Sequence, residues 1–421
     1  MADSTRRVTF RDVFGVREFR WLWFAELMSI AGDQLARVAL SILVYNDTGS
    51  AALTGLTYAL TFAPSILGGI LLSGLADRFP RRDVMMVVDL LRAGLIALVM
   101  IPMPFWAMCV LVGSVSFLNP LFKSSQVSLL PDILEGDRFT VGMAIRSMTI
   151  QSAQVLGFFG GGLLLITVDP RLALGLDALT FLASALFIRF GLQKRAAASA
   201  GADRPPFLKS MGQGGRLIFA DPALRVLLLF TWLAGLIPVY EGIAAPYADL
   251  AGNGNSAALG LLLAADPVGS VIGAAVYTKW VPARARPKLP GVLTVLTAVP
   301  LLFCLLEPGL LSSVVLFAVC GGLGSVALMQ ATVTYTLKVP DERRGQAISL
   351  SNTGLTTIMG LSPLAGGLLA DQIGAYNAVA VFGGIGLALA IPLALAWRRI
   401  VNQDTDRWIP SEDKETSEAA T

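Results

Sequence analysis

Three charged residues share one face of the first long apolar segment of this chain. Glu26, Asp33 and Arg37 are spaced i, i+7 and i+11, and at about 100° per residue this spacing places them on one side of a helix. A charged side chain costs about 2.5–3.5 kcal/mol at the centre of an apolar span, so it is expected to face a cavity or a partner. We therefore take these three residues as candidates for proton coupling.

The same three residues also allow a purely structural interpretation. Asp33 and Arg37 form an i, i+4 pair that can neutralise itself and merely pack. Glu26 has no evident partner nearby in the sequence. Burial in a low-dielectric site favours the neutral form of such a lone carboxyl, which suits it to proton exchange. The alternative for Glu26 is a protonated or water-exposed side chain near the inner end of the helix.

Other polar residues inside apolar segments are candidates for the wall of a substrate cavity. They are Asn119, Lys123, Gln151, Glu241, Asp266, Gln330 and Asn352. Lys123 can be a counter-ion for Glu26 or Asp33, can attract an anionic substrate, or can extend its amine to a headgroup. For Glu241 the sequence favours the outer mouth of a cavity. Arg146, near an inner helix end, is interpreted as a topology anchor rather than a ligand.

The segments that carry these residues belong to a strongly apolar chain. Of its 421 residues, 55% are hydrophobic and 14% are charged, whereas an ordinary soluble domain has about 25% charged residues. Since a soluble surface needs roughly 25–35% charged side chains, most of this surface is expected to face lipid. The net charge of +3 is too small to indicate a nucleic-acid partner.

The absence of histidine from the chain restricts its chemistry. It removes Ser-His catalysis, His-ligated zinc or haem, and histidine proton relays. No GxxxxGK(S/T) phosphate loop occurs, which excludes P-loop binding of ATP. Cys109, Cys304 and Cys320 lie in apolar runs and are interpreted as buried hydrophobes. No cofactor or metal is therefore expected, an enzyme is disfavoured, and any proton handling falls to carboxylates.

Apolar runs of about 20 residues, the length that spans a bilayer, recur twelve times along the chain. The predicted spans are 19–44, 53–74, 84–105, 107–130, 141–167, 171–191, 224–246, 257–280, 290–306, 309–336, 345–371 and 375–397. The polar stretch 192–222 is interpreted as a linker between two six-helix halves. The predicted domains are thus 1–191 and 223–399, followed by a polar tail, 400–421.

Positive charge alternates between successive loops. The segment before the first span, the linker and every second loop are basic, whereas the opposite set of loops holds only Arg171. Basic loops stay on the cytoplasmic side of a membrane. The alternation predicts a multi-pass membrane protein with both termini in the cytoplasm. The excess of arginine over lysine and the abundance of alanine indicate a bacterial source, and hence the bacterial cell membrane.

Short motifs recur in the two halves at a common offset of a little over two hundred residues. The pairs are Ser50-Ala51-Ala52-Leu53 with Ser256-Ala257-Ala258-Leu259, Pro131-Asp132 with Pro340-Asp341, and Gly161-Gly162-Leu163-Leu164 with Gly366-Gly367-Leu368-Leu369. A common offset predicts two parallel halves related by an axis along the membrane normal.

The loop between the second and third spans carries the most specific motif, Gly74-Leu75-Ala76-Asp77-Arg78-Phe79-Pro80-Arg81-Arg82. It resembles the cytoplasmic loop signature of the major facilitator superfamily. The resemblance implies two six-helix bundles that rock around a midplane cavity. Gly74 would allow two helices to approach closely, and Asp77 would accept hydrogen bonds at a helix N-terminus. Together with Arg78, Arg81 and Arg82 they would form a conformational latch; the alternative is a basic loop that only sets topology.

Further motifs are similar to the branch of that superfamily that holds enterobactin exporters and macrolide efflux proteins. They are Phe19-Arg20-Trp21-Leu22-Trp23, Gly32-Asp33-Gln34, Tyr45-Asn46-Asp47-Thr48-Gly49-Ser50 and Asp89-Leu90-Leu91-Arg92-Ala93. This resemblance implies export, usually by proton antiport. The chain departs from the antiporters in two places. The predicted span 107–130 lacks their Arg, and the stretch Gly157-Phe158-Phe159-Gly160-Gly161-Gly162 lacks the proline of their Gly-Pro-x-x-Gly-Gly motif.

The sequence therefore predicts an all-α integral membrane transporter that works as a monomer. It is expected to export an amphipathic small molecule, such as a drug, natural product or siderophore, through a mostly apolar cavity with few charges. Alternating access driven by protons is the expected mechanism, and multidrug resistance is a possible outcome of such efflux. A nutrient importer or uniporter of the same fold, and a membrane sensor without transport, are the alternatives.

Overall fold

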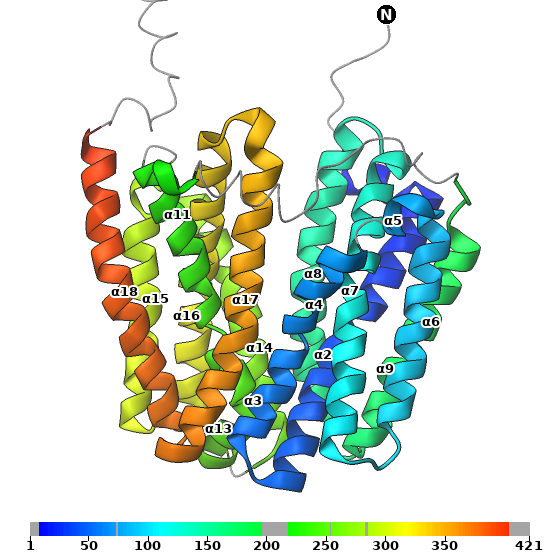
Figure 1. The fold of residues 1–421 in the computed structure, drawn as a ribbon, viewed down its shortest axis with the longest axis horizontal. Coiled ribbons are helices and arrows are strands. Elements are labelled where there is room, and N and C mark those ends of the chain that lie inside the picture. The colour runs from blue at the N-terminus through cyan, green and yellow to red at the C-terminus, as the bar shows by residue number, and fades with distance from the viewer. Residues whose placement is uncertain (1–7, 73–74, 196–217, 253, 283–284, 404–421) are drawn as a thin grey trace, which may run out of the picture. The chain divides into compact units, whose positions relative to one another are not determined.

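The computed structural model describes residues 8–72, 75–195, 218–252, 254–282 and 285–403, and within these ranges every regular element is a helix (Figure 1). The helices of the first half are α1 (Phe10–Phe14), α2 (Arg17–Thr48), α3 (Ala51–Leu60), α4 (Ala63–Leu72), α5 (Leu75–Arg78), α6 (Arg81–Val99), α7 (Phe105–Ile133), α8 (Asp137–Leu164) and α9 (Pro170–Gly191). Those that follow are α11 (Pro222–Leu233), η1 (Ala234–Leu236), α12 (Val239–Gly242), α13 (Ala244–Gly252), α14 (Ser256–Trp280), η2 (Arg286–Lys288), α15 (Pro290–Leu302), η3 (Phe303–Leu306), α16 (Leu310–Lys338), α17 (Asp341–Ile373) and α18 (Ala375–Gln403).

Each of the twelve predicted spans corresponds to one helix or to a broken helix. The span predicted at 53–74 is divided into α3 and α4, and the span at 224–246 is divided into α11, η1, α12 and the start of α13. Pro238 stands between η1 and α12, and a proline cannot donate the backbone hydrogen bond that a continuous helix needs. The short α12 that results carries Glu241.

Nine of the helices in the described ranges are long and apolar enough to cross a membrane. The three predicted spans outside this set have identifiable sequence causes: α6 carries several Arg and Asp residues, α8 is rich in Gln, Ser and Gly, and the stretch Pro290–Leu306 is short. Large apolar side chains such as Leu71, Trp106 and Phe190 are exposed on the helix surfaces. Exposed apolar side chains of this kind are expected where a helix faces lipid.

The chain forms two compact units that differ from the predicted halves. The first comprises Met1–Arg204, Pro238–Pro267 and Met359–Ala375, and the second comprises Pro205–Ile237, Val268–Ile358 and Tyr376–Thr421. Two segments from the second half of the sequence thus belong to the first unit. One of them belongs there because α12 and α13 both pack on α3. In addition, α13 packs on α2.

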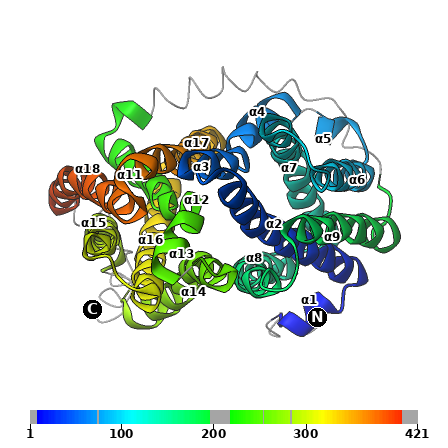
Figure 2. The ribbon, with the colours of Figure 1, turned by 90° about the horizontal axis from the view of Figure 1, so that it is seen from below.

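Within the first unit, the long helices pack side by side. The end-on view in Figure 2 shows α6 between α7 and α9, and α2 beside α8 and α9. Leu22, Met85, Leu129 and Ile188, from four of these helices, form part of one buried apolar cluster. This packing brings the polar face of α2 toward α6, α7 and α8.

Two close helix crossings in the first unit use the glycines of the repeated motif. Gly162 of α8 lies against Gly260 of α14, where a Cβ on Gly162 would come within 2.6 Å of the Gly260 Cα. Gly367 of α17 lies against Ala51 and Ala52 at the start of α3. Small residues allow helix backbones to approach this closely in membrane proteins. The two copies of the motif therefore occupy corresponding crossings.

A carboxylate holds the second of these crossings. Asp371 of α17 accepts hydrogen bonds from the Ser50 Oγ at 2.8 Å and from the backbone N–H of Ala51 at 2.7 Å. The first N–H groups of a helix have no partner within the helix, and an anion is favoured beside them. Asp371 therefore attaches the end of α17 to the start of α3.

The second unit has its own apolar core. Leu227 of α11, Tyr335 of α16 and Trp397 of α18 are buried in one cluster. The Tyr335 hydroxyl donates a hydrogen bond to the Ala347 carbonyl at 3.0 Å, and the Trp397 Nε1 donates to the Pro287 carbonyl at 3.0 Å. The buried polar groups of Tyr335 and Trp397 are thus satisfied by backbone acceptors.

The Gly162 crossing generates a prediction with a matched control on the same helix. Gly162→Ala should lower the free energy of unfolding by about 1–3 kcal/mol, because overpacking forces α8 and α14 apart. Gly160→Ala should leave stability unchanged or raise it slightly, since no atom lies within 4 Å of its added Cβ. SDS-induced unfolding of the purified protein measures both. Equal effects of the two substitutions would contradict the crossing.

Candidate functional site

The first unit contains a cavity of about 340 Å³ with a strongly charged wall. Its lining includes four acidic and four basic side chains: Glu26, Asp33, Glu241, Asp266, Arg37, Arg92, Lys123 and Arg146. Three phenylalanines, Phe62, Phe122 and Phe158, add an apolar surface. The expectation of a mostly apolar cavity with few charges is therefore wrong for this cavity. An amphipathic solute matches its mixed lining better than a purely apolar one.

Glu26 is paired, contrary to the expectation that it stands alone. The Arg146 Nε of α8 donates a hydrogen bond to the Glu26 Oε1 at 2.8 Å, and both side chains are largely buried. The Arg146 Nη2 also lies 3.4 Å from the Gln126 Oε1. Arg146 is thus a cavity residue as well as a residue near a helix end. Its partner lies 120 positions away in the chain, a separation at which sequence spacing carries no information on contacts.

The predicted ion pair between Asp33 and Arg37 is not among the ion pairs of the described residues. The Asp33 carboxylate instead accepts hydrogen bonds from the Arg92 Nη2 of α6 at 3.0 and 3.2 Å. Arg37 donates to the Gln34 Oε1 at 3.2 Å, and its guanidinium lies 4.4 Å from the centre of the Phe62 ring. The two residues share the cavity, but each has its own partners.

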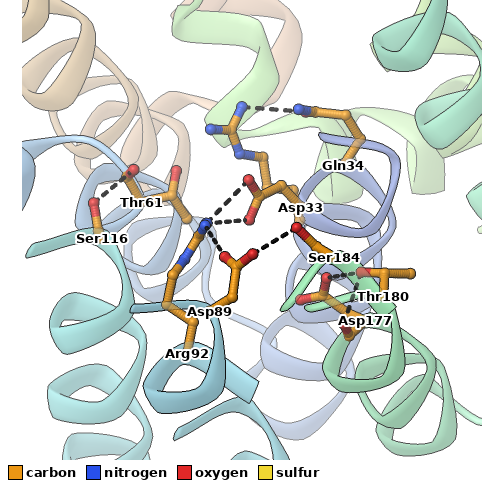
Figure 3. Close-up of polar contacts among 10 residues, drawn as sticks. Asp33, Gln34, Thr61, Asp89, Arg92, Ser116, Asp177, Thr180 and Ser184 are labelled. Atoms are coloured by element: carbon orange, nitrogen blue, oxygen red, sulfur yellow. Dashed lines mark hydrogen bonds and ion pairs between the residues drawn. The ribbon is translucent and has the colours of Figure 1, made fainter. Parts of the chain in front are cut away.

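Arg92 is the centre of a buried polar cluster between α2, α6 and α9 (Figure 3). Its Nη1 lies 3.6 Å from the Asp89 Oδ1, and the Ser184 Oγ donates to the Asp89 Oδ2 at 2.5 Å. The Phe181 ring lies 4.1 Å from the guanidinium. Arg92 and Asp89 are both almost completely buried.

A third carboxyl, that of Asp177 on α9, lies against the same part of α2. The Thr180 Oγ1 donates to its Oδ1 at 3.2 Å, and Asp177 is 1% exposed. A Cβ on Gly32 would come within 2.3 Å of this Oδ1, so only glycine fits beside Asp177 at that position. The side chain therefore lies next to the residue that precedes Asp33.

Sequence reasoning missed Asp89, Arg92 and Asp177 as site residues. The same observation that identified Glu26 applies to them, because each is a charged residue inside an apolar run. Asp89 and Arg92 also belong to a motif that contributed to the family resemblance. Their common contact with the surroundings of Asp33 is visible only in the folded chain.

Two further cavity carboxyls are bound by tyrosine hydroxyls. The Tyr58 hydroxyl of α3 donates a hydrogen bond to Glu241 of α12, and the Tyr240 hydroxyl donates to the Asp266 Oδ1 of α14 at 3.0 Å. Glu241 is buried in the cavity wall, whereas the sequence favoured the outer mouth for it. In the described part of the chain, neither carboxyl takes part in an ion pair.

The remaining cavity candidates fall into two groups. Asn119 and Lys123 of α7 line the cavity, and Lys123 makes no ion pair with any described residue. Gln151 does not line it, because Ile150 and Gln154 occupy the cavity face of α8 and a neighbouring residue points about 100° away. Gln330, bonded to Tyr277 and Thr334, and the exposed Asn352 belong to the second unit.

The loop that was predicted to form a latch is described only in part. Gly74 and the side chain of Asp77 lie outside the described residues, and Arg78 is exposed. The Arg81 Nη1 donates to the Ser128 carbonyl at 2.6 Å and to the Asp132 Oδ2 at 2.8 Å. The Arg82 Nη1 donates to the Leu192 carbonyl at 3.2 Å. These two arginines attach the start of α6 to the ends of α7 and α9.

Acidic and thiol side chains are the potential metal ligands of the described residues, since the chain has no histidine. Within the described ranges, no group of three or more Cys, Asp or Glu side chains is placed to hold a metal ion.

A family model places the chain among known proteins over nearly its whole length. The model described as Major Facilitator Superfamily matches residues 22–293 and 239–420. The enterobactin exporter EntS of Shigella boydii serotype 4 (strain Sb227) is 28% identical over 390 residues, which cover 90% of this chain and 87% of that protein. EntS of Escherichia coli O1:K1 / APEC has the same identity and coverage.

Solved structures share the fold. The nucleoside transporter NupG has a TM-score of 0.72 at 12% identity and covers 90% of this chain and 99% of its own. A peptide transporter POT in complex with sulfate has a TM-score of 0.72 at 17% identity, with coverage of 96% and 98%. A bacterial homologue of the human lysosomal transporter Spinster has a TM-score of 0.72 at 14% identity, with coverage of 91% and 98%.

The Glu26–Arg146 pair should contribute measurably to the stability of the protein. Arg146→Ala should lower the free energy of unfolding by about 3–5 kcal/mol, because it leaves a buried carboxylate without its partner. The double variant Glu26→Gln/Arg146→Ala should recover most of that loss. Arg138→Ala, at an exposed arginine of the same helix, is the control with little effect. SDS-induced unfolding tests all three, and a double variant as unstable as Arg146→Ala would argue against the pair.

Proposed function

Because this chain belongs to the Major Facilitator Superfamily, we propose that it exports an amphipathic small molecule in exchange for protons. Membership makes it a multi-pass membrane transport protein and not an enzyme. The proposal concerns the direction of transport and the coupling ion. The likeness to enterobactin exporters over 90% of the chain supports export.

The observation that carries proton coupling is the environment of Glu241 and Asp266. Each carboxyl lines the cavity and accepts a hydrogen bond from a tyrosine hydroxyl. A carboxylate in an ion pair loses a strong attraction when it binds a proton, whereas a carboxyl held by a neutral hydroxyl does not. These two residues are therefore better placed than Glu26 to bind and release a proton in each cycle. Asp33 stays a candidate, together with Arg37 as its neighbour on α2.

The cavity wall suggests what the exported molecule looks like. Arg37 and Lys123 form no ion pair with a carboxylate of the described residues, so they can attract anionic or hydrogen-bond-accepting groups of a solute. Phe62, Phe122 and Phe158 supply aromatic surfaces for its apolar part. A drug, natural product or siderophore with both kinds of group fits this lining.

Alternating access requires contacts that form in one state and break in the other. We assign the Asp371–α3 contact and the glycine crossings to the closed outer side, and the loop Gly74–Arg82 to a latch on the inner side. The basic loops support this orientation, since such loops favour a cytoplasmic location of both termini in a bacterial cell. The proposed transporter works as a monomer.

Efflux from loaded membrane vesicles tests the proposal. A strain that lacks the protein is first compared with its parent on a panel of toxic compounds that includes enterobactin, a macrolide and a cationic dye. Vesicles are then loaded with any compound to which the strain has become sensitive. An imposed pH gradient should drive efflux by the wild type. Accumulation of a nutrient by the parent strain alone would support an importer instead.

Substitution of the tyrosine-bound carboxyls gives the decisive comparison. Glu241→Gln and Asp266→Asn should abolish efflux driven by the pH gradient and should keep downhill efflux, since the amides cannot exchange a proton but preserve the cavity shape. Glu135→Gln, at an exposed residue outside the cavity wall, is the control and should behave as the wild type. Proton coupling would be refuted if efflux by the wild type were the same with and without the pH gradient, and if both variants transported as the wild type does.

A further inference from the structure

The Arg92 guanidinium lies between two carboxylates that come from different helices. Its Nη2 is bonded to both oxygens of Asp33, at 3.0 and 3.2 Å, whereas its Nη1 is 3.6 Å from the Asp89 Oδ1 (Figure 3). The first distances are those of charge-assisted hydrogen bonds, and the last is too long for one. Arg92 is thus engaged with Asp33 and only adjacent to Asp89.

Two atoms of this group are left without a hydrogen bond. The Asp89 Oδ1 and the Arg92 Nε are buried, and neither has a hydrogen-bond partner among the described residues. Burying an unsatisfied polar atom is costly, and more so when the group is charged. A small shift of the guanidinium away from Asp33 would give the Asp89 Oδ1 its missing donor. The geometry therefore contains a second arrangement of the same three residues.

The surroundings permit that shift. The Phe181 ring lies 4.1 Å from the guanidinium, and a cation can slide over an aromatic face without losing its attraction to it. A second cavity, of about 40 Å³, borders Asp33, Arg92 and Asp177. A space of this size exceeds what one water molecule needs, so water can occupy the Asp33 side of the cluster when the guanidinium moves toward Asp89.

Asp33 is the carboxyl of this cluster that faces the large cavity. Its side chain is 26% exposed, whereas the Asp89 side chain is fully buried. Lys123 of α7 and Arg37 of α2 line the same large cavity. Asp177 of α9 does not line it, but borders the second cavity together with Asp33. A proton from cavity water therefore reaches Asp33 first.

We propose that Arg92 is a charge switch that transmits the protonation state of Asp33 to α6 and α9. Ionised Asp33 holds the guanidinium through two hydrogen bonds. When Asp33 takes a proton from cavity water, its attraction for the cation falls, and the guanidinium moves to the Asp89 carboxylate. Asp89, Arg92 and Asp177 are then positioning residues for the coupling step. The inference rests on the proposed proton exchange and adds Asp89 and Asp177, which do not line the large cavity, to it.

The switch differs from a static ion pair in one measurable way. In the switch, the Asp89 carboxylate competes with Asp33 for one cation, so Asp89 favours protonation of Asp33. Removing the charge of Asp89 should therefore keep Arg92 on Asp33 and keep Asp33 ionised. In a static pair, Asp89→Asn would also disfavour protonation of Asp33, because a negative charge is lost, but protonation of Asp33 would not change the hydrogen bonding of the Asp89 carboxylate. The distinguishing feature of the switch is therefore a change at Asp89 when Asp33 takes a proton.

Infrared difference spectroscopy of the purified full-length protein in nanodiscs measures this directly, without any substrate. Protonated carboxyls have a C=O stretching band that carboxylates lack. As the buffer is made more acidic from neutral, the wild type should develop a C=O band that Asp33→Asn removes. A shift in a carboxylate stretching band should accompany it, because the Asp89 Oδ1 gains a donor, and this shift should be lost in Asp89→Asn. In Asp89→Asn the protonated fraction of Asp33 in a mildly acidic buffer should fall by about tenfold, the equivalent of one charge-assisted hydrogen bond.

Asp83→Asn is the matched control on the same helix. Lys194 donates a hydrogen bond to Asp83, and this bond, with the positive charges of Lys194 and Arg82, lowers the pKa of that carboxyl below its ordinary value. Asp83 therefore stays ionised in the range of the experiment, and its replacement should leave the band unchanged. If Asp89→Asn does not fold, Ser184→Ala is measured instead, because it removes the hydroxyl that donates to the Asp89 Oδ2 and should therefore move the carboxylate band that belongs to Asp89.

The outcomes separate this inference from the proposed function. An Asp33 band that is absent from the wild type, or that develops without the accompanying shift in the Asp89 carboxylate band, overturns the switch. Proton-driven efflux through Glu241 and Asp266 can persist in that case, so the proposed function would stand. Absence of proton-driven efflux from the wild type overturns the proposed function, and the inference falls with it.

Discussion

The cost of placing ionisable groups among apolar helices governs this structure. A charge within such a helix needs a partner, and the partners here come from other helices: Arg146 for Glu26, and Arg92 for Asp33. Each pair joins α2 to a different neighbour, α8 in one case and α6 in the other. The charged side chains that line the cavity therefore also form the ion pairs that hold α6 and α8 against α2.

Much of this architecture could be predicted from the sequence, because it depends on local properties. Length and hydropathy located a helix at each of the twelve predicted spans, and the loop motif around Asp77 indicated the superfamily. The interruption at Pro238 was less predictable, since prolines such as Pro120 and Pro363 lie inside continuous helices. The predicted pairing of Asp33 with Arg37 was wrong for a physical reason. Asp33 is four residues from Arg37 and 59 from Arg92, yet helix packing selected the distant partner.

The compact units show a second limit of sequence reasoning. The repeated motifs correctly indicated corresponding glycines, yet Gly162 and Gly367 lie at crossings that join segments from both halves of the sequence within one unit. A repeat describes how two halves resemble each other. It carries no information on which parts of them are in contact in a given conformation, and a transporter must change those contacts during its cycle.

The short helix α12 has a consequence for the speed at which its carboxyl can respond. Glu241 stands on a four-residue helix that follows Pro238, while Glu26 and Asp33 stand on a helix of 32 residues. Reorienting a long packed helix requires a collective motion on the microsecond-to-millisecond scale, whereas loop-like segments move faster. A local reorientation of α12 would thus move Glu241 without tilting a long helix. The cavity wall thus combines carboxyls on a long packed helix with one carboxyl on a single helical turn.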